Sequence, residues 1–337
     1  MSFFMLGAER KVKESNKLKI LSELINWQKC EKYLKRVHKN DENSQGGQKA
    51  YNNLQMFKAL LLQQWHSLSD EELEEALSLR IDFMVFTGFE LNDEVPDSST
   101  ICRFRNKLIK QNLDKKLFKE INYQLEKAGL KVEKAKAAIL DATIIESASR
   151  PKRIINIEND REEKGTEITI EESKDPDARW LKKGKKSHFG YKVFAVVDEK
   201  GYYLNVLTES ANEAEVNKLE KSITGVKAKR VMADKGYTSA SNRNFLKQNQ
   251  YKDGIMYKAQ KNKPLTKREK LLNKLISKKR YVVEQCFGTM KRKFEFERAS
   301  YKTKRKVDAQ FILKAICSNM LKAVNCLLKG DFVPICG

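Results

Sequence analysis

Closely spaced cysteines are missing from this sequence. A zinc knuckle or ribbon needs pairs of cysteines about two to four residues apart, and no such pair occurs. The spacing argues against a metal finger and equally against a disulfide framework. The six cysteines are Cys30, Cys102, Cys286, Cys317, Cys326 and Cys336.

A long apolar run is also missing. No stretch of about 18 apolar residues is evident, which is the length that a membrane-spanning helix requires. The amino-terminal segment MSFFMLGAERKVKES becomes charged too early for a signal peptide. We therefore expect a soluble chain in the reducing cytoplasm, without a membrane partner.

Acidic residues are too few to balance the basic ones. The 337 residues include 45 Asp+Glu and 67 Lys+Arg, which gives a formal net charge of +22. Because 40% of the residues are hydrophobic, the chain is not a basic disordered tail, and its length allows two or three domains with buried cores. The positive excess indicates a polyanionic partner, with nucleic acid as the first candidate and an anionic membrane surface as the second.

Helical periodicity dominates residues 1–130. We expect one amphipathic helix over about 18–37 within an accessory arm, residues 1–50, which ends in the polar linker KNDENSQGGQK. Residues 51–130 repeat apolar side chains at helical spacing, and Ser69 with Glu72 forms a capping-box signature. The segment DSSTICRFRNKLIK offers Ser and Thr caps for a basic helix. This part of the chain is predicted to be an all-helical domain.

Residues 136–325 have the pattern of a mixed α/β sheet. The strands AAILDATIIES, SHFGYKVFAVVD and GYYLNVLTES come first, and the strands RVMAD and GIMYKA then alternate with helices. A long basic helix begins near Lys267, and residues 326–337 form a tail. This order is the order of an RNase H-like core. Residues 150–186 interrupt it with a charged surface insertion, too poor in apolar residues to fold firmly alone, which we expect to order on DNA.

Two aspartates stand where strands are predicted. Asp141 lies inside the apolar run AAILDATII, where a charge is costly unless it is hydrogen-bonded or bound to a cation. Asp234 ends the run VMAD, and strand ends beside a loop are where α/β folds place ligands. The alternatives are a solvated structural aspartate at the end of the sheet for Asp141 and a turn-initiating aspartate for Asp234.

A glutamate on the long basic helix is the third candidate. Arg280, Glu284 and Lys291 form a stripe beside the apolar face of that helix. The alternative is an ordinary ion pair between residues four apart on a solvated helix. Three carboxylates at one edge of a sheet would supply hard oxygen ligands for two Mg²⁺ ions, which stabilise the attacking and leaving oxygens of an in-line phosphoryl displacement.

These motifs resemble a known family. Asp141, Asp234 and Glu284, with ADKGYTSASNR around the second and R-x3-E-x6-K around the third, are similar to the DDE catalytic core of bacterial insertion-sequence transposases, in particular the insertion-sequence-five type. The segments FKALLLQQWHSLSDEELEEAL and PDSSTICRFRNKL resemble the helical amino-terminal domain of that type. Related families often have a tyrosine three residues before the arginine, where this chain has Ser277.

The resemblance implies a fold, a reaction and a set of site residues. We expect an RNase H-like catalytic domain preceded by a helical DNA-binding domain, and two Mg²⁺ or Mn²⁺ ions per active site held by the three carboxylates. The reaction would be cleavage at the terminal inverted repeats of the element, followed by transfer of the 3′ hydroxyl into target DNA. The protein would act as a homodimer on double-stranded DNA, associated with the bacterial nucleoid.

The expected DNA contacts come from two regions. Those of the catalytic motifs are Arg280, Lys291, Lys235 and Tyr237, and those of the helical domain are Ser99, Thr100, Arg103 and Arg105. Either arginine of the helical domain could instead belong to the solvated face of a bundle helix. His188 is either a packed structural residue or a contact to DNA or substrate.

Two other functions remain open at this point. A non-catalytic or domesticated DNA-binding regulator would explain the charge and the basic helix without cleavage. An RNase H-like repair or RNA-processing nuclease would share the metal chemistry. The charge is concentrated, since residues 258–306 contain 18 Lys+Arg and 4 Asp+Glu, and we expect these cations to surround the metal site and to make DNA binding depend steeply on salt.

Overall fold

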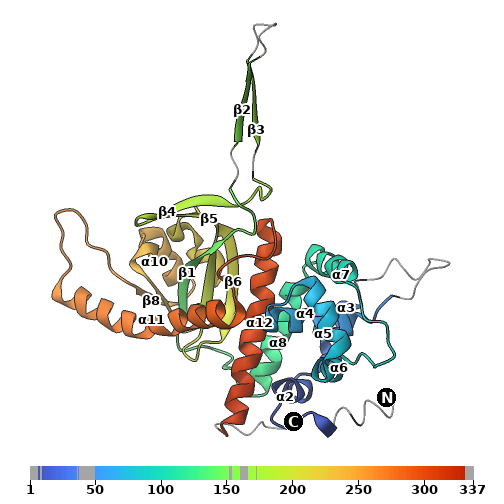
Figure 1. The fold of residues 1–337 in the computed structure, drawn as a ribbon. Helices are drawn as coiled ribbons and strands as arrows, with labels where there is room; N and C mark the ends of the chain where they lie inside the picture. Colours follow the sequence, from blue (N-terminus) through green and yellow to red (C-terminus); the bar gives the residue numbers. More distant parts are fainter. Residues whose placement is uncertain are drawn as a thin grey trace.

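A helical domain and an α/β domain lie side by side, and the long helix α12 (Lys304–Leu328) runs between them (Figure 1). The computed structural model describes residues 7, 10–35, 37, 50–151, 154–159, 166–171 and 173–330. Buried side chains of both domains belong to one hydrophobic cluster, to which α12 contributes Phe311 and Ile316. The two domains therefore share a core.

The amino-terminal helices belong to the helical domain and do not form an arm apart from it. The helix expected over 18–37 is two helices, because Asn26 interrupts it and caps the second one by accepting a hydrogen bond from the Lys29 amide at 3.3 Å. Leu21 and Leu34 are fully buried in the shared core. The expected linker, residues 39–49, lies outside the described residues. The helices are α2 (Lys17–Leu24), α3 (Trp27–Leu34), α4 (Asn53–His66), α5 (Asp70–Leu79), α6 (Ile81–Thr87), α7 (Ser98–Lys110) and α8 (Leu113–Lys127).

The sequence predicted the cap of α5 correctly, but it predicted the wrong residues for the cap of α7. The capping box at the start of α5 is confirmed, with the Ser69 hydroxyl and the Glu72 carboxylate each accepting a hydrogen bond from the other's amide. The cap of α7 is Asp97, which accepts from the Thr100 amide at 2.7 Å. Ser99 and Thr100 lie in the first turn of that helix and do not cap it.

The α/β domain is built on a mixed sheet. Its strands are β1 (Ala138–Glu146), β4 (Arg179–Lys183), β5 (Lys186–Val197), β6 (Tyr203–Ser210), β7 (Arg230–Ala233) and β8 (Lys252–Ile255). They run in the order β4-β5-β1-β7-β8, and β6 also pairs with β5, beyond the segment that β4 occupies. β1, β7 and β8 are parallel to one another, while β5 is antiparallel to β1.

Helices cover both faces of this sheet. On one face, α9 (Leu219–Ile223) and α10 (Ala240–Gln248) bury Leu140 and Val231. On the other face, α11 (Lys267–Phe294) and α12 bury Ile139 and Met232. Because side chains alternate along a strand, Asp141 points to the same face as Ile139, which is the face covered by α11. The short helices η1 (Glu215–Lys218) and η2 (Lys235–Tyr237) complete the domain.

The charged insertion contains regular structure. β2 (Ile154–Asn159) and β3 (Thr166–Glu171) pair as an antiparallel hairpin that projects from the body (Figure 1). β4, which follows, pairs with the first half of β5 and so belongs to the main sheet. The insertion was expected not to fold firmly alone, and β4 is ordered by pairing with a strand of the main sheet, which supplies its backbone hydrogen bonds.

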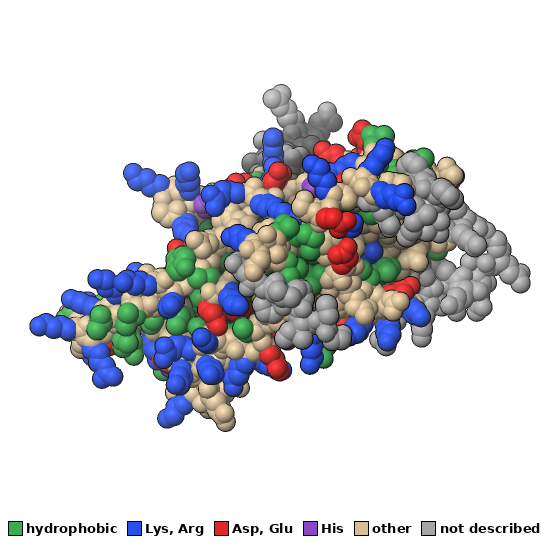
Figure 2. All heavy atoms as spheres, turned by 90° about the horizontal axis from the view of Figure 1, so that it is seen from below, with side chains coloured by type: hydrophobic (Ala, Val, Ile, Leu, Met, Phe, Trp, Pro, Cys, Tyr) green, Lys and Arg blue, Asp and Glu red, His purple; other side chains and the backbone are tan. Residues whose placement is uncertain are grey.

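The basic helix α11 is 28 residues long, and its first half extends past the sheet (Figure 1). Lys and Arg side chains gather on this projecting end, with hydrophobic side chains among them (Figure 2). Leu271 and Leu275 are more than half exposed there. A large part of the positive excess is thus carried by a protruding element.

α12 was not singled out by the sequence analysis, although it connects the two domains. By length and mean hydropathy it could cross a membrane, but 72% of its most apolar window is buried inside the protein, and Lys314, Ser318 and Asn319 interrupt its apolar residues. Its Arg305 forms a two-pronged ion pair with the fully buried Asp114 of α8, at 2.6 and 2.8 Å. Its Asn319 pairs with the backbone of Tyr203 on β6. These contacts mark α12 as a core helix.

Replacing a central side chain of α12 should destabilise both domains together. Phe311 is fully buried, stacks on Phe296 at 5.5 Å and meets Tyr203 edge-on at 6.1 Å. We expect Phe311→Ala to lower the free energy of unfolding by about 3–5 kcal/mol, the cost typical of such a cavity. Urea denaturation followed by circular dichroism measures it. Leu328→Ala, at an exposed position of the same helix, should change stability little, and equal losses in the two variants would contradict the shared core.

Candidate active site

Asp141 and Asp234 lie next to each other at one edge of the sheet. β1 and β7 are parallel neighbours, and Ile139 is paired with Met232. Each aspartate stands two residues beyond its member of that pair, so both carboxylates are on the face that α11 covers. The sequence predicted that both aspartates stand at strand ends. This placement brings together two residues that are 93 positions apart in the chain.

An arginine of α11 bridges the two carboxylates. The guanidinium of Arg280 donates a hydrogen bond to Oδ2 of Asp141 at 2.8 Å and lies 3.6 Å from Oδ1 of Asp234. Burial raises the pKa of Asp141, and the nearby Arg280 opposes that rise. Arg280 was expected to hold DNA, but here it neutralises the aspartates and is itself only 9% exposed.

Two polar atoms at this site are buried without a partner in the described part of the chain. They are the hydroxyl of Tyr237 and Nε of Arg280. Buried donors are normally hydrogen-bonded, so each such exception calls for a specific explanation. Tyr237 is fully buried, so its expected contact with the DNA backbone or a flanking base stays a prediction that would require its side chain to become exposed. Burial raises the pKa of the Tyr237 hydroxyl well above its usual value, and the negative charges of the site carboxylates add to this rise.

A fourth carboxylate, Glu215, lies close to the pair. Its Oε2 comes within 3.0 Å of where a Cβ on Gly236, two residues after Asp234, would be, and it adds to the negative field around Asp141. Lys192 of β5 pairs with it at 3.7 Å. Sequence reasoning missed Glu215 because it stands in a short charged helix, η1, with no apolar run or motif around it.

Glu284 is one helical turn from Arg280 on α11. Residues four apart on a helix have Cβ atoms about 5–6 Å apart on the same face. Its side chain is exposed, and across the described residues no three acidic, His or Cys side chains are close enough to hold a metal ion in this conformation. The structure thus brings Asp141 and Asp234 together and leaves Glu284 beside them. All three offer the oxygen ligands that Mg²⁺ prefers.

The remaining catalytic-domain candidates are placed at different depths. Lys235 is exposed next to Asp234, and Lys291 is half-buried on the same stripe of α11 as Glu284. His188 lies seven residues along β5 from Ala195, the partner of Asp141. At the rise of a β-strand this separation is about 23 Å, so His188 is not part of the carboxylate site.

In the helical domain, Arg103 and Arg105 have opposite environments. Arg105 is buried, pairs with Asp70 of α5 at 2.6 and 2.7 Å, and lies over the ring of Tyr301 at 4.4 Å. The alternative of a solvated position is wrong, while the expected DNA contact of Arg105 stays a prediction that would require this ion pair to open. Arg103 is exposed and donates to the hydroxyls of Ser99 and Thr100, so these three residues form one polar surface at the start of α7.

The two arginines should therefore respond differently to truncation. We expect Arg105→Ala to destabilise the protein by about 3 kcal/mol, because it leaves the Asp70 carboxylate without its partner. Arg103→Ala should leave the melting temperature unchanged and weaken DNA binding. Thermal unfolding and fluorescence anisotropy with a labelled duplex separate the two effects. A large stability loss in Arg103→Ala would contradict this assignment.

The sequence matches two family models. A model described as "Transposase DDE domain" matches residues 133–320, which include the aspartate pair, α11 and most of α12. A model described as "Transposase domain (DUF772)" matches residues 7–107, which cover the helical domain from α2 to most of α7. The fold and the carboxylate site thus coincide with the matched DDE region, and the chain belongs to the DDE transposases of insertion sequences.

A curated relative agrees with this assignment. The chain is 45% identical over 225 residues to the transposase for insertion sequence element IS1106 of Neisseria meningitidis serogroup B, a match that covers 66% of this chain and 77% of the relative. No solved structure matches the chain. The narrower assignment to the insertion-sequence-five type stays a prediction.

Proposed function

We propose that this chain is an active DNA transposase that cuts DNA at the ends of its insertion sequence and joins the freed 3′ hydroxyl to target DNA. The observation that carries the proposal is the aspartate pair on neighbouring parallel strands, facing a helix with Arg280 and Glu284. The strand order β6-β5-β1-β7-β8, in which β5 runs antiparallel to its neighbours β6 and β1 while β1, β7 and β8 are parallel, supports an RNase H-like catalytic core.

The family generally acts with divalent metal ions, and the site has suitable donors. We assign Asp141, Asp234 and Glu284 as the residues that would hold two Mg²⁺ or Mn²⁺ ions. Bound there, the metals would polarise the phosphodiester and generate the attacking hydroxide. In this conformation the guanidinium of Arg280 forms ion pairs with the carboxylates of the two aspartates. Its guanidinium would have to move to a phosphate when the site is loaded, which would also give its unpartnered Nε a partner.

The other residues would position the DNA. Lys235 and Lys291 flank the carboxylates and would contact backbone phosphates as point charges. Ser99, Thr100 and Arg103 at the start of α7 would contact the terminal inverted repeats through their hydroxyl and guanidinium groups, which suit phosphate oxygens. The protein would act in the cytoplasm, on nucleoid DNA, and as a homodimer because two element ends must be brought together.

Conservative changes in the carboxylate triad, Asp141, Asp234 and Glu284, should abolish DNA cleavage while leaving DNA binding intact. We expect Asp141→Asn, Asp234→Asn and Glu284→Gln each to reduce cleavage of a duplex carrying an element end by at least about a thousandfold, because each removes a charge needed for metal binding. DNA affinity should stay within about threefold of wild type. Gel assays of nicking with Mg²⁺ and anisotropy measure these quantities.

The matched control is Glu220→Gln, an exposed glutamate on α9 at the other face of the sheet. It should cut and bind like wild type. Normal cleavage by Asp141→Asn would remove the assignment of the triad. Binding by the wild type without any metal-dependent nicking would favour the non-catalytic regulator.

Removing the bridging arginine should expose the carboxylates to metal. We expect Arg280→Ala to lower the melting temperature without metal, because two neighbouring carboxylates lose their counter-charge. Mn²⁺ should then raise the melting temperature of the variant more than that of wild type, since ligand binding to the folded state stabilises it. A thermal-shift titration with Mn²⁺ measures this. An equal Mn²⁺ response in both proteins would contradict competition between Arg280 and the metal.

A further inference from the structure

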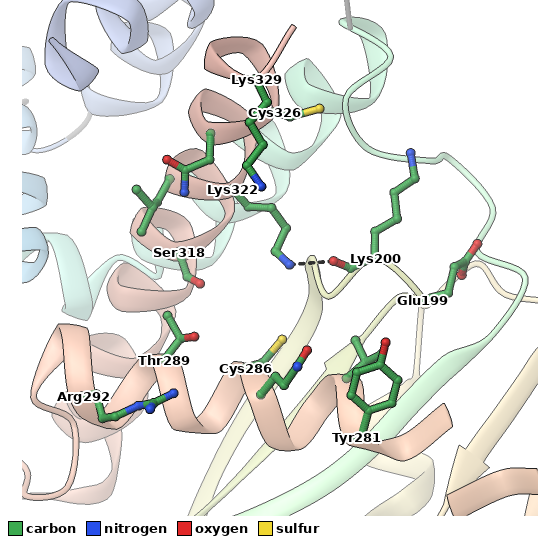
Figure 3. Close-up of a pocket in the computed structure, with 14 residues that line it drawn as sticks. Glu199, Lys200, Tyr281, Cys286, Thr289, Arg292, Ser318, Lys322, Cys326 and Lys329 are labelled. Atoms are coloured by element: carbon green, nitrogen blue, oxygen red, sulfur yellow. Dashed lines mark hydrogen bonds between the residues drawn. The ribbon is translucent and has the colours of Figure 1, made fainter. Parts of the chain in front are cut away.

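Beside α11, on the flank away from the carboxylates, lies a hollow lined by basic residues. One part of it, of about 570 Å³, is bounded by α11, α12 and the turn between β5 and β6. Tyr281 and Arg292 of α11 face Lys322 and Lys329 of α12 across it, and the β5–β6 turn with Lys200 closes one end (Figure 3). Lys322 is fixed by a hydrogen bond to the Lys200 carbonyl at 2.6 Å.

A second part, of about 580 Å³, continues the first. The two share Glu199, Tyr281 and Val282 as lining residues, so we treat them as one surface, the α11 groove. The floor of the second part is apolar, with Ile139 and Met232. Its rim carries the basic side chains of Lys136, Lys229, Arg230, Lys252 and Lys279.

The charge of the α11 groove is not balanced within the protein. Among the described residues, none of the groove's basic side chains forms an ion pair with a carboxylate, whereas Lys192, Lys218 and Arg243 elsewhere in the domain do. Glu199 is the one acidic lining residue in the two parts. Its carboxylate accepts hydrogen bonds from the amides of Lys136 and Ala137. Lysines and arginines gathered without counter-charge in a concave surface concentrate the field that attracts a polyanion.

The groove and the carboxylates are neighbours that α11 separates. Ile139 on the groove floor is two residues before Asp141 on the same face of β1, a separation of about 7 Å. Arg280, which bridges the aspartates, lies between Lys279 and Tyr281, which line the groove. The phosphodiester that is cut, and the target phosphodiester that the freed 3′ hydroxyl attacks, must both reach the aspartates on one flank of the helix. DNA in the groove occupies the other flank.

We propose that the α11 groove binds target DNA, by the phosphate backbone of a duplex and without reading its sequence. The proposal rests on the function proposed above, and it assigns to the target duplex on either side of the attacked phosphodiester a surface beside the carboxylate site. Lysines dominate the groove, and they contact phosphates as point charges without the forked geometry that reads bases. A surface of this kind suits a duplex that is held by its phosphates.

Direct binding tests the groove. Two double variants of the full-length protein neutralise its two parts, Lys229→Gln with Lys279→Gln and Lys200→Gln with Arg292→Gln. The control, Lys182→Gln with Lys247→Gln, removes the same charge from exposed positions on β4 and α10. Anisotropy with an unrelated duplex is measured from low to moderate salt. Each groove variant should reduce the slope of log affinity against log salt by about 2, roughly one per lost phosphate contact, and the control should keep the wild-type slope.

Strand transfer then identifies the duplex. With precut element ends and a plasmid target, we expect each groove variant to lose at least about tenfold in joining, while cleavage of uncut ends stays within about threefold of wild type. Groove variants that keep the salt slope of the control would overturn DNA binding by the groove. Equal losses of cleavage and joining would overturn the assignment to target DNA, because the groove would then hold the element end. If the wild type cuts no DNA, the proposed function fails, and the anisotropy data still decide whether the groove binds a duplex.

Discussion

The burial of α12 between two domains is the constraint on which the rest of the structure depends. Phe311 completes the aromatic cluster against β6, and Arg305 closes the ion pair with the buried Asp114 of α8. Since α11 rests on the same face of the sheet, its orientation over β1 and β7 is set by the core that α12 completes. The position of Arg280 between two aspartates is therefore a result of packing throughout the catalytic domain.

Much of the α/β domain could be predicted because its strands are short apolar runs separated by clear turns. The carboxylates at strand ends followed from the same pattern, since a charge inside AAILDATII needs a partner. Other features depend on contacts distant in sequence. The break at Asn26, the burial of Arg105 against Asp70 and the enclosure of Tyr237 are each decided by a neighbouring element. The role of α12 was not predicted, because the sequence of an apolar helix does not show which elements it packs against.

The structure also shows on which side of α11 the basic residues lie. Its basic residues were expected to surround the metal site. In the structure, Arg280 is occupied by the aspartates, while Lys279 and Arg292, which belong to the same helix, line the groove on the other flank. One helix thus presents a flank whose arginine is neutralised by two aspartates and a second flank whose basic side chains have no ion-pair partner among the described residues.

The order of elements along the chain has a consequence for synthesis. α12 follows every other described element, yet it packs on α4 and α8 as well as on β6. Neither domain can finish burying its apolar surface while the chain is still emerging from the ribosome, so folding is completed only after residues near 328 have been made. A chain interrupted before residue 304 would leave apolar surfaces of both domains uncovered, which would make it a substrate for chaperones and proteases.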